Sequence, residues 1–257
     1  MISIENLHFT YDIQNAFGLY DINLEFKAGE IVALLGPNGS GKTTLLKCLY
    51  GALKPHAGVI YLNGKNLLEF KSSELARHVG GVPQSHIPSF PFKSIDVVVM
   101  GRTPHTSIFS SPSERDYEKA REFFEELGIA ELTERPYTHI SGGERQLVFV
   151  ARALMQEPKV LLLDEPTAHL DIKNRVKVLR AVKRIAGKGE ITVVMSLHDP
   201  NEAMLFSNKI LLLKNGKVQA YGPPREVISE EVLRNLYGED FNIFTAGNRK
   251  IVVYDIQ

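Results

Sequence analysis

The sequence has few of the features that would fix its fold by covalent bonds or its partners by charge. Cys48 is the only cysteine among 257 residues, so no disulfide can form within the chain. That shortage favours a reducing compartment. The 30 basic residues are balanced by 30 acidic ones. A net charge of zero gives no indication of nucleic acid or an anionic membrane as a partner, and we expect no nucleic acid partner.

Long apolar runs are also missing. The longest, such as Ile31–Leu35 and Val160–Leu163, fall far short of the roughly 18 residues that cross a bilayer. The first twelve residues, MISIENLHFTYD, carry acidic side chains and alternate between apolar and polar, unlike a signal peptide. We therefore expect a soluble chain. If it serves transport, another chain must provide the path through the membrane.

The periodicity predicts an α/β fold. Apolar and polar residues alternate over 2–10 and 22–26, which is typical of a half-buried antiparallel sheet. Continuously apolar segments predict parallel strands that are buried on both faces: 31–35, 160–163, 191–195 and 210–213. Helical patterns separate them, over 42–50 before Gly51 and over 171–186 before Gly187. Such alternation favours a mostly parallel sheet with an antiparallel β-subdomain at the N-terminus.

One long segment interrupts this alternation. A proline-rich stretch around Pro83, Pro88 and Pro91 is followed by helical patterns over 94–100, over 113–127 and from Ser141 onwards. We predict a helical subdomain, residues 84–156, inserted into a core made of residues 1–83 and 157–257. Together they form a single domain. From residue 217 onwards we expect a strand, a short helical pair and a final strand over 251–254.

A phosphate-binding loop is the strongest local signal. It follows the buried strand 31–35, opens a helix and fits the Walker A pattern: Gly36, Pro37, Asn38, Gly39, Ser40, Gly41, Lys42 and Thr43, with Thr44 next. Glycines allow backbone N–H groups to surround phosphates, and the helix N-terminus adds positive charge. Lys42 can reach the β- and γ-phosphates, and the Thr43 hydroxyl can bind Mg²⁺. A glycine-rich turn without a ligand is the alternative.

Two acids end a later buried strand. Asp164 and Glu165 follow Val160–Leu163 and should lie at the carboxyl edge of the sheet, where such folds bind ligands. Asp164 is expected to hold Mg²⁺, and Glu165 can polarise an attacking water. Two solvated acids that cap the next turn are the alternative, which the upstream Walker A loop makes less attractive.

The segment Ile140-Ser141-Gly142-Gly143-Glu144 resembles the signature of ABC ATPases, usually written L-S-G-G-Q. Here Ile replaces Leu, and Glu replaces Gln. Ser141 can cap the following helix, while the Gly142 and Gly143 amides form a second anion site. A plain capping box is the alternative. The position just upstream of Asp164 supports the signature.

Further residues match the same family in order along the chain. By resemblance, Gln84 is the Q-loop glutamine that contacts Mg²⁺ and water, and Asp171 is the D-loop residue that faces a partner subunit. His198 resembles the H-loop histidine beside the γ-phosphate. Tyr11 occupies the place of the aromatic that stacks on adenine, although core packing is an alternative for it and for the nearby Phe17.

The resemblance covers essentially the whole chain and implies a P-loop NTPase (RecA-like) fold and an ATP hydrolase that uses ATP and Mg²⁺. It implies a homodimer in which two ATP molecules lie between Walker A of one chain and the signature of the other. It also implies integral membrane permease subunits, an extracytoplasmic substrate-binding protein and a peripheral location at the cytoplasmic face of the cell membrane. Apolar residues of segment 85–105 are expected to line the groove that receives the permease: Ile87, Phe90, Phe92, Val98, Val99 and Met100. Packing in the small core of the helical subdomain is the alternative for at least half of them.

Finer features look like the ATPases of iron-siderophore, haem and cobalamin importers. They are the stretch VVMGRTPH at 98–105 and the tail AYGPPREVI at 220–228 with LYG at 236–238. ATPases of zinc, manganese or molybdate importers, a soluble ABC protein of DNA repair or translation, and a P-loop small-molecule kinase are the alternatives. The sequence does not name the transported molecule.

Overall fold

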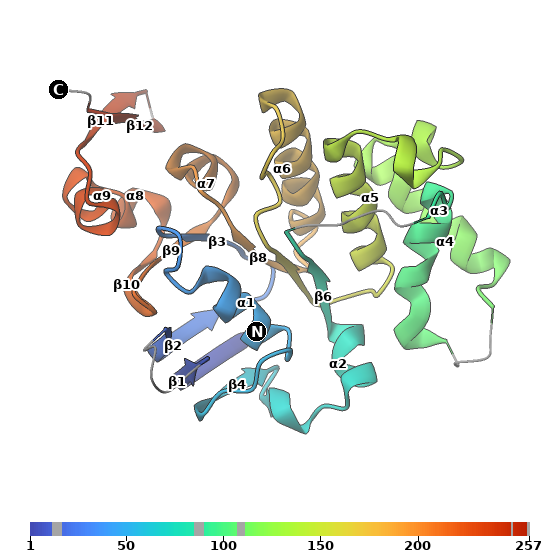
Figure 1. Ribbon diagram of the computed structural model, residues 1–257, viewed down its shortest axis with the longest axis horizontal. Helices are drawn as coiled ribbons and strands as arrows, with labels where there is room; N and C mark the ends of the chain where they lie inside the picture. The colour runs from blue at the N-terminus through green and yellow to red at the C-terminus, as the bar shows by residue number, and fades with distance from the viewer. Residues whose placement is uncertain (12–16, 85–89, 107–110, 248, 256–257) are drawn as a thin grey trace.

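The computed structural model describes residues 1–11, 17–84, 90–106, 111–247 and 249–255. Its strands form three sheets, with helices packed against the largest of them (Figure 1). The order is β10-β9-β3-β8-β7-β6 in the largest sheet, β2-β1-β4-β5 in the second and β11-β12 in the third. The predicted combination of a mostly parallel sheet with an N-terminal antiparallel sheet is confirmed.

The six-stranded sheet positions the site. Its strands are β3 (Ile31–Leu35), β6 (Val79–Val82), β7 (Val160–Leu163), β8 (Thr192–Ser196), β9 (Lys209–Lys214) and β10 (Lys217–Gly222). All pairings are parallel except that of the edge strand β10 with β9. Every residue of β3, β7 and β8 is buried, as expected of parallel strands that are covered on both faces.

The antiparallel sheet is larger than the alternation pattern predicts. It contains β1 (Ile2–Thr10), β2 (Gly18–Phe26), β4 (Ala57–Leu62) and β5 (Lys65–Asn66). The second strand begins at Gly18 rather than at residue 22, and β4 and β5 were not expected. With α1 (Lys42–Leu49), the sheet covers one face of the six-stranded sheet, because Leu45 and Phe26 share a buried cluster with Val32 and Leu162.

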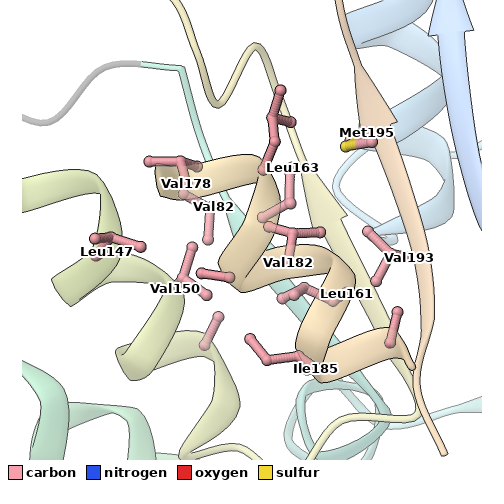
Figure 2. Packing of buried hydrophobic residues seen from close by; sticks show 14 of the residues in the cluster. Val82, Leu147, Val150, Leu161, Leu163, Val178, Val182, Ile185, Val193 and Met195 are labelled. Carbon is pink, nitrogen blue, oxygen red and sulfur yellow. The ribbon is translucent and has the colours of Figure 1, made fainter. Parts of the chain in front are cut away.

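Helices α5 (Gly142–Leu154) and α6 (Ile172–Ala186) cover the opposite face. Figure 2 shows Leu147 and Val150 of α5 and Val178, Val182 and Ile185 of α6 pointing toward the strand residues Leu161, Leu163 and Val193. All of these side chains are at most 3% exposed. Each strand contributes side chains to the buried clusters on both faces of the sheet, because successive side chains along a strand point to opposite faces.

The stretch after β6 is mainly helical. It contains α3 (Ser94–Val99), α4 (Glu114–Leu127) and α5, with 3₁₀ turns at Met100–His105, Ala130–Leu132 and Tyr137–His139. The predicted helices at these places are confirmed to within a residue or two. The short helix α2 (Ser72–His78) and the 3₁₀ turn Leu67–Glu69 were not predicted.

The C-terminal part continues with α7 (Pro200–Phe206), α8 (Pro224–Val227), α9 (Glu230–Tyr237) and the hairpin of β11 (Phe241–Ala246) and β12 (Arg249–Tyr254). The predicted helical pair is therefore confirmed, but the final strand has a partner, β11, that was not expected. In the part of the chain that the structure describes, no helix combines the length and apolar character needed to cross a bilayer.

Candidate functional site: a phosphate loop beside two carboxylates

The phosphate loop connects β3 to α1 and depends on glycine. Gly36 has φ +156°, and a Cβ atom there would lie 2.2 Å from the carbonyl oxygen of Leu213. Gly41, the residue before α1, has φ +106°, and a Cβ atom there would lie 2.8 Å from Leu19 Cδ2. Residues that carry a side chain rarely adopt such φ angles. The loop therefore keeps this shape only with glycine at both positions.

Lys42 turns its ammonium group back over the loop. Its Nζ donates hydrogen bonds to the carbonyl oxygens of Gly36, at 2.7 Å, and Pro37, at 3.1 Å. Burial lowers the pKa of Lys42, while the negative charges of Glu165 and Asp164 oppose that shift. A buried cation thus faces two carboxylates across the loop, an arrangement that suits an anionic ligand held with a cation.

Asp164 is tied to two hydroxyl groups. Its Oδ1 accepts hydrogen bonds from Thr43 Oγ1 at 3.1 Å and from Ser196 Oγ at 2.7 Å. Ser196 Oγ in turn accepts the backbone N–H of Glu165 at 2.7 Å. The ends of β7 and β8 and the start of α1 therefore meet in one hydrogen-bond network. Ser196, the last residue of β8, was not predicted as a site residue.

Glu165 lies where two other side chains converge. Its Oε2 accepts a hydrogen bond from Gln84 Nε2 at 2.5 Å, and its Oε1 lies 2.8 Å from His198 Nε2. The Glu165 side chain is only 14% exposed. Its φ of +49° is unusual for a residue with a side chain and is the kind of backbone strain found at functional sites. The structure thus brings together Gln84, Glu165 and His198, three residues far apart in the sequence.

A pocket of about 260 Å³ opens above the loop. Its lining combines the phosphate loop with one carboxylate and two aromatic rings: Tyr11, Phe17, Asn38, Gly39, Ser40, Gly41, Lys42, Thr43, Thr44 and Glu165. The rings of Tyr11 and Phe17 stack with centroids 5.8 Å apart, and the Tyr11 hydroxyl lies 3.4 Å from Thr44 Oγ1. About half of the Tyr11 surface is exposed, so the ring is not a core residue.

The oxygen atoms at the pocket fit Mg²⁺. Thr43 Oγ1 and Asp164 Oδ1 are neighbours, and hydroxyl and carboxylate oxygens are ligands that this ion accepts, with phosphate and water completing its shell. The amide of Gln84 is bonded to Glu165 in this structure. No cluster of three or more acidic, histidine or cysteine ligands occurs among the described residues.

The predicted signature residues do not line this pocket. Ser141 caps α5 in a capping box with Glu144, and Ser141 and Gly142 are exposed. Gly143 packs so closely on α6 that a Cβ atom would lie 2.7 Å from Asn174. Asp171 caps α6 and accepts hydrogen bonds from the backbone and the side chain of Asn174. All four residues therefore lie outside the phosphate loop and do not line its pocket.

Comparisons with known proteins point to one family. The model of the family described as ABC transporter matches residues 19–168. The hemin import ATP-binding protein HmuV of Escherichia coli O157:H7 is 37% identical over 99% of this chain and 100% of its own length. The petrobactin import ATP-binding protein FpuC of Bacillus anthracis is 35% identical over 97% and 91%. The molybdate import ATP-binding protein MolC of Haemophilus influenzae is 36% identical over 92% and 87%.

Solved structures extend the likeness to the whole fold. A chain of a metal-chelate type ABC transporter in an inward-facing conformation superimposes with a TM-score of 0.87, at 33% identity, over 99% of this chain and 97% of that one. A dimeric ATP-binding cassette bound to ADP and phosphate superimposes with a TM-score of 0.74, at 29% identity, over 88% of this chain and 99% of that one.

Proposed function

The chain belongs to the ABC transporter family, as an ATP-binding subunit that hydrolyses ATP, and from that premise we propose how its residues act. The observation that carries the proposal is the position of Glu165 beside the phosphate loop, held by Gln84 and His198. We assign Glu165 as the base that polarises an attacking water, since its carboxylate is fixed by two neighbours. Lys42 and the loop amides hold the phosphates.

The other pocket residues bind the rest of the nucleotide in this proposal. Tyr11 stacks on adenine at the exposed end of the pocket, next to Phe17. Thr43 and Asp164 hold Mg²⁺, with Gln84 near it, and the ion neutralises charge on the phosphates when it is bound. His198 lies beside the γ-phosphate of the bound nucleotide and orients the Glu165 carboxylate.

A second copy of the chain completes each site. Ser141, Gly142, Gly143 and Asp171 do not line the pocket of their own chain, and Ser141 and Gly142 are exposed at the start of α5. A helix N-terminus with free amides suits an anion. We therefore assign these residues to the phosphates held by a second copy, in a twofold pair with two bound ATP molecules.

Coupling requires a membrane partner. Phe90, Phe92 and Met100 are exposed by 65%, 48% and 39% at the entry to the helical segment, which we define as residues 84–156. Ile87, also predicted for this groove, lies outside the described residues. The apolar side chains support a groove for permease subunits at the cytoplasmic face of the membrane. The helical segment moves as a unit, so that closure of the dimer around ATP also moves the permease bound to this segment.

The transported molecule is assigned by likeness. The names of the relatives include hemin and petrobactin import, which supports an importer of iron-siderophore, haem or cobalamin that also uses an extracytoplasmic binding protein. A relative named for molybdate import supports the alternative of an oxyanion or metal importer.

Glu165→Gln tests the proposed mechanism. The variant keeps the hydrogen bond to Gln84 but loses the base, so we expect hydrolysis to fall about 10²- to 10⁴-fold while ATP still binds. The pair should then persist with ATP and elute as a dimer in size-exclusion chromatography. Glu69→Gln is the control, because Glu69 is exposed on another part of the surface. A Glu165→Gln variant that binds ATP normally yet stays monomeric would contradict the shared site.

A further inference from the structure

The C-terminal hairpin has two apolar faces, only one of which is covered. Phe241 of β11 and Val252 of β12 are 5% and 8% exposed and belong to the main buried cluster. On the other face, Phe244 pairs with Ile251, and these side chains are 58% and 43% exposed. Val253 adds another 43% exposed side chain. We call Phe244, Ile251 and Val253 the open hairpin face.

The hairpin is anchored to the body of the protein. The Asn201 side chain on α7 donates a hydrogen bond to the carbonyl oxygen of Val252 at 3.0 Å and accepts one from its N–H at 2.9 Å. Glu230 of α9 accepts the N–H of Ile243 at 2.8 Å, and Lys250 donates to the carbonyl oxygen of Ile228 at 2.8 Å. Exposed apolar faces on an anchored element often take part in interactions with a partner.

Its place relative to the nucleotide pocket indicates the partner. The hairpin packs on α7, which begins two residues after His198. Figure 1 shows it at the end of the molecule opposite α3 and α4, with α1, α5 and α6 between. Because the phosphate loop precedes α1 and the signature starts α5, the order along the longest axis is hairpin, phosphate loop, signature, and then α3 and α4 of the helical segment.

We propose that the open hairpin face packs against the helical segment of a second copy of this chain when ATP closes the pair. This inference rests on the proposed twofold site. A twofold axis that places the signature of each chain over the phosphate loop of the other reverses the order of the second chain. The hairpin of one chain then lies beyond the signature of the other, over its helical segment. The interface continues outward from the nucleotide at both ends.

The permease is a less suitable occupant. The exposed residues assigned to the permease, Phe90 and Phe92, follow β6, which is one edge of the six-stranded sheet. The hairpin packs on α7 and α9, which contact β3 and β9 in the other half of the sheet. A partner held at Phe92 therefore lies at the other end of the molecule from the open hairpin face.

The dissociation constant of the ATP-bound dimer tests the proposed contact of the open hairpin face. In the Glu165→Gln background, Phe244→Ser combined with Ile251→Ser removes two apolar side chains, so we expect the dissociation constant of the ATP-bound dimer to rise about 10-fold or more. ATP affinity and the melting temperature should stay at the values of the background. Leu68→Ser, a change at a 52% exposed leucine on another surface, should leave the dimer unchanged. An unchanged constant in the hairpin variant overturns the inference and leaves the shared site intact.

Cross-linking identifies the occupant without relying on stability. Cys48 is fully buried, and burial raises the pKa of its thiol to about 12, so Phe244→Cys provides the one reactive thiol among the described residues. A benzophenone maleimide attached there should, with ATP and Glu165→Gln, capture residues 84–156 of a second copy. Capture of permease subunits in the assembled transporter, or no capture at all, overturns the inference. Loss of the dimer in Glu165→Gln alone overturns it together with the shared site.

Discussion

Glu165 combines a strained backbone with a restrained side chain. Its positive φ angle holds the carboxylate at the end of β7, and Gln84 and His198 approach it from two other elements. The contact with Gln84 links the carboxylate to the start of the helical segment. A change in the helical segment that moves Gln84 therefore changes the support of the base, and the same contact can carry the effect of nucleotide back to the segment.

Lys42→Ala and His198→Ala should separate binding from turnover. Lys42 is the buried cation of the loop, and its loss should weaken ATP binding about 10- to 100-fold, since charge-assisted hydrogen bonds to phosphate disappear. His198 is half exposed and contacts Glu165, so His198→Ala should keep most of the affinity and lose turnover. Calorimetric ATP titration with a phosphate-release assay checks both. Loss of affinity alone in both variants would refute the role of His198.

For individual residues, the sequence predicted which ones form the site better than it predicted which atoms they contact. Gly36 to Thr44, Asp164 and Glu165 stand in two short runs whose local geometry follows from a strand end and a helix start. The structure places Asn38 to Thr44 and Glu165 around one pocket, and Asp164 is hydrogen-bonded to Thr43. The bridge through Ser196 could not be predicted, because it depends on how β8 pairs with β7. Phe17 next to Tyr11 was noticed without an assigned role, and only the stacked rings show that it lines the pocket.

Among the elements, α5 starts with a reciprocal cap. Glu144 accepts the backbone N–H of Ser141 at 2.8 Å, and Ser141 Oγ accepts the N–H of Glu144. The backbone hydrogen bond, helped by the Ser141 side chain, holds the pKa of Glu144 below its usual range. The same cap fixes the orientation of Ser141 and Gly142, so helix stability and the proposed anion site depend on one pair of residues.

This cap should make stability depend on pH. A carboxyl group whose pKa is lowered by folding stabilises the protein fully above its unfolded pKa of about 4.3, and this contribution is lost as the pH falls through the folded pKa. Wild type should therefore exceed Glu144→Gln by up to about 1 kcal/mol at pH 6–7, and the difference should shrink below about pH 4. Urea unfolding across pH 3.5–7 measures it. A difference that stays constant over this range would show that the charge of Glu144 contributes nothing.

Helix and strand positions were predictable where the pattern was long or capped. The helices predicted over 113–127 and from Ser141 onwards match α4 and α5, and the predicted Ser141 cap is present; Ser113 also caps α4, which ends at Gly128. The strand β4 was missed because its first two residues are exposed, and its Gly58 approaches the backbone of Asn6 at an irregularity in the pairing with β1. β11 was missed although it forms a hairpin with the predicted final strand β12.

For the whole molecule, Phe92→Asp tests the coupling to a membrane partner. Phe92 is 48% exposed, so a charge there should leave the melting temperature and ATP binding unchanged while it abolishes association with the permease and substrate-linked hydrolysis. Leu205→Asp, at a 46% exposed leucine on α7, is the matched control. Co-purification with the permease and ATPase assays in vesicles measure the effect. A clearly lower melting temperature would place Phe92 in the core instead, and normal transport would move the groove elsewhere.

The contact between Gly143 and Asn174 has a consequence for the movement of the two helix starts. Asn174 holds the carboxylate of Asp171 through two hydrogen bonds and leaves no room for even a methyl group at Gly143. The start of α5 and the start of α6 are therefore packed directly on each other, and the same Asn174 contacts both Gly143 and Asp171. In the proposed twofold pair, a movement of Asn174 would thus displace the signature and the D-loop residue together.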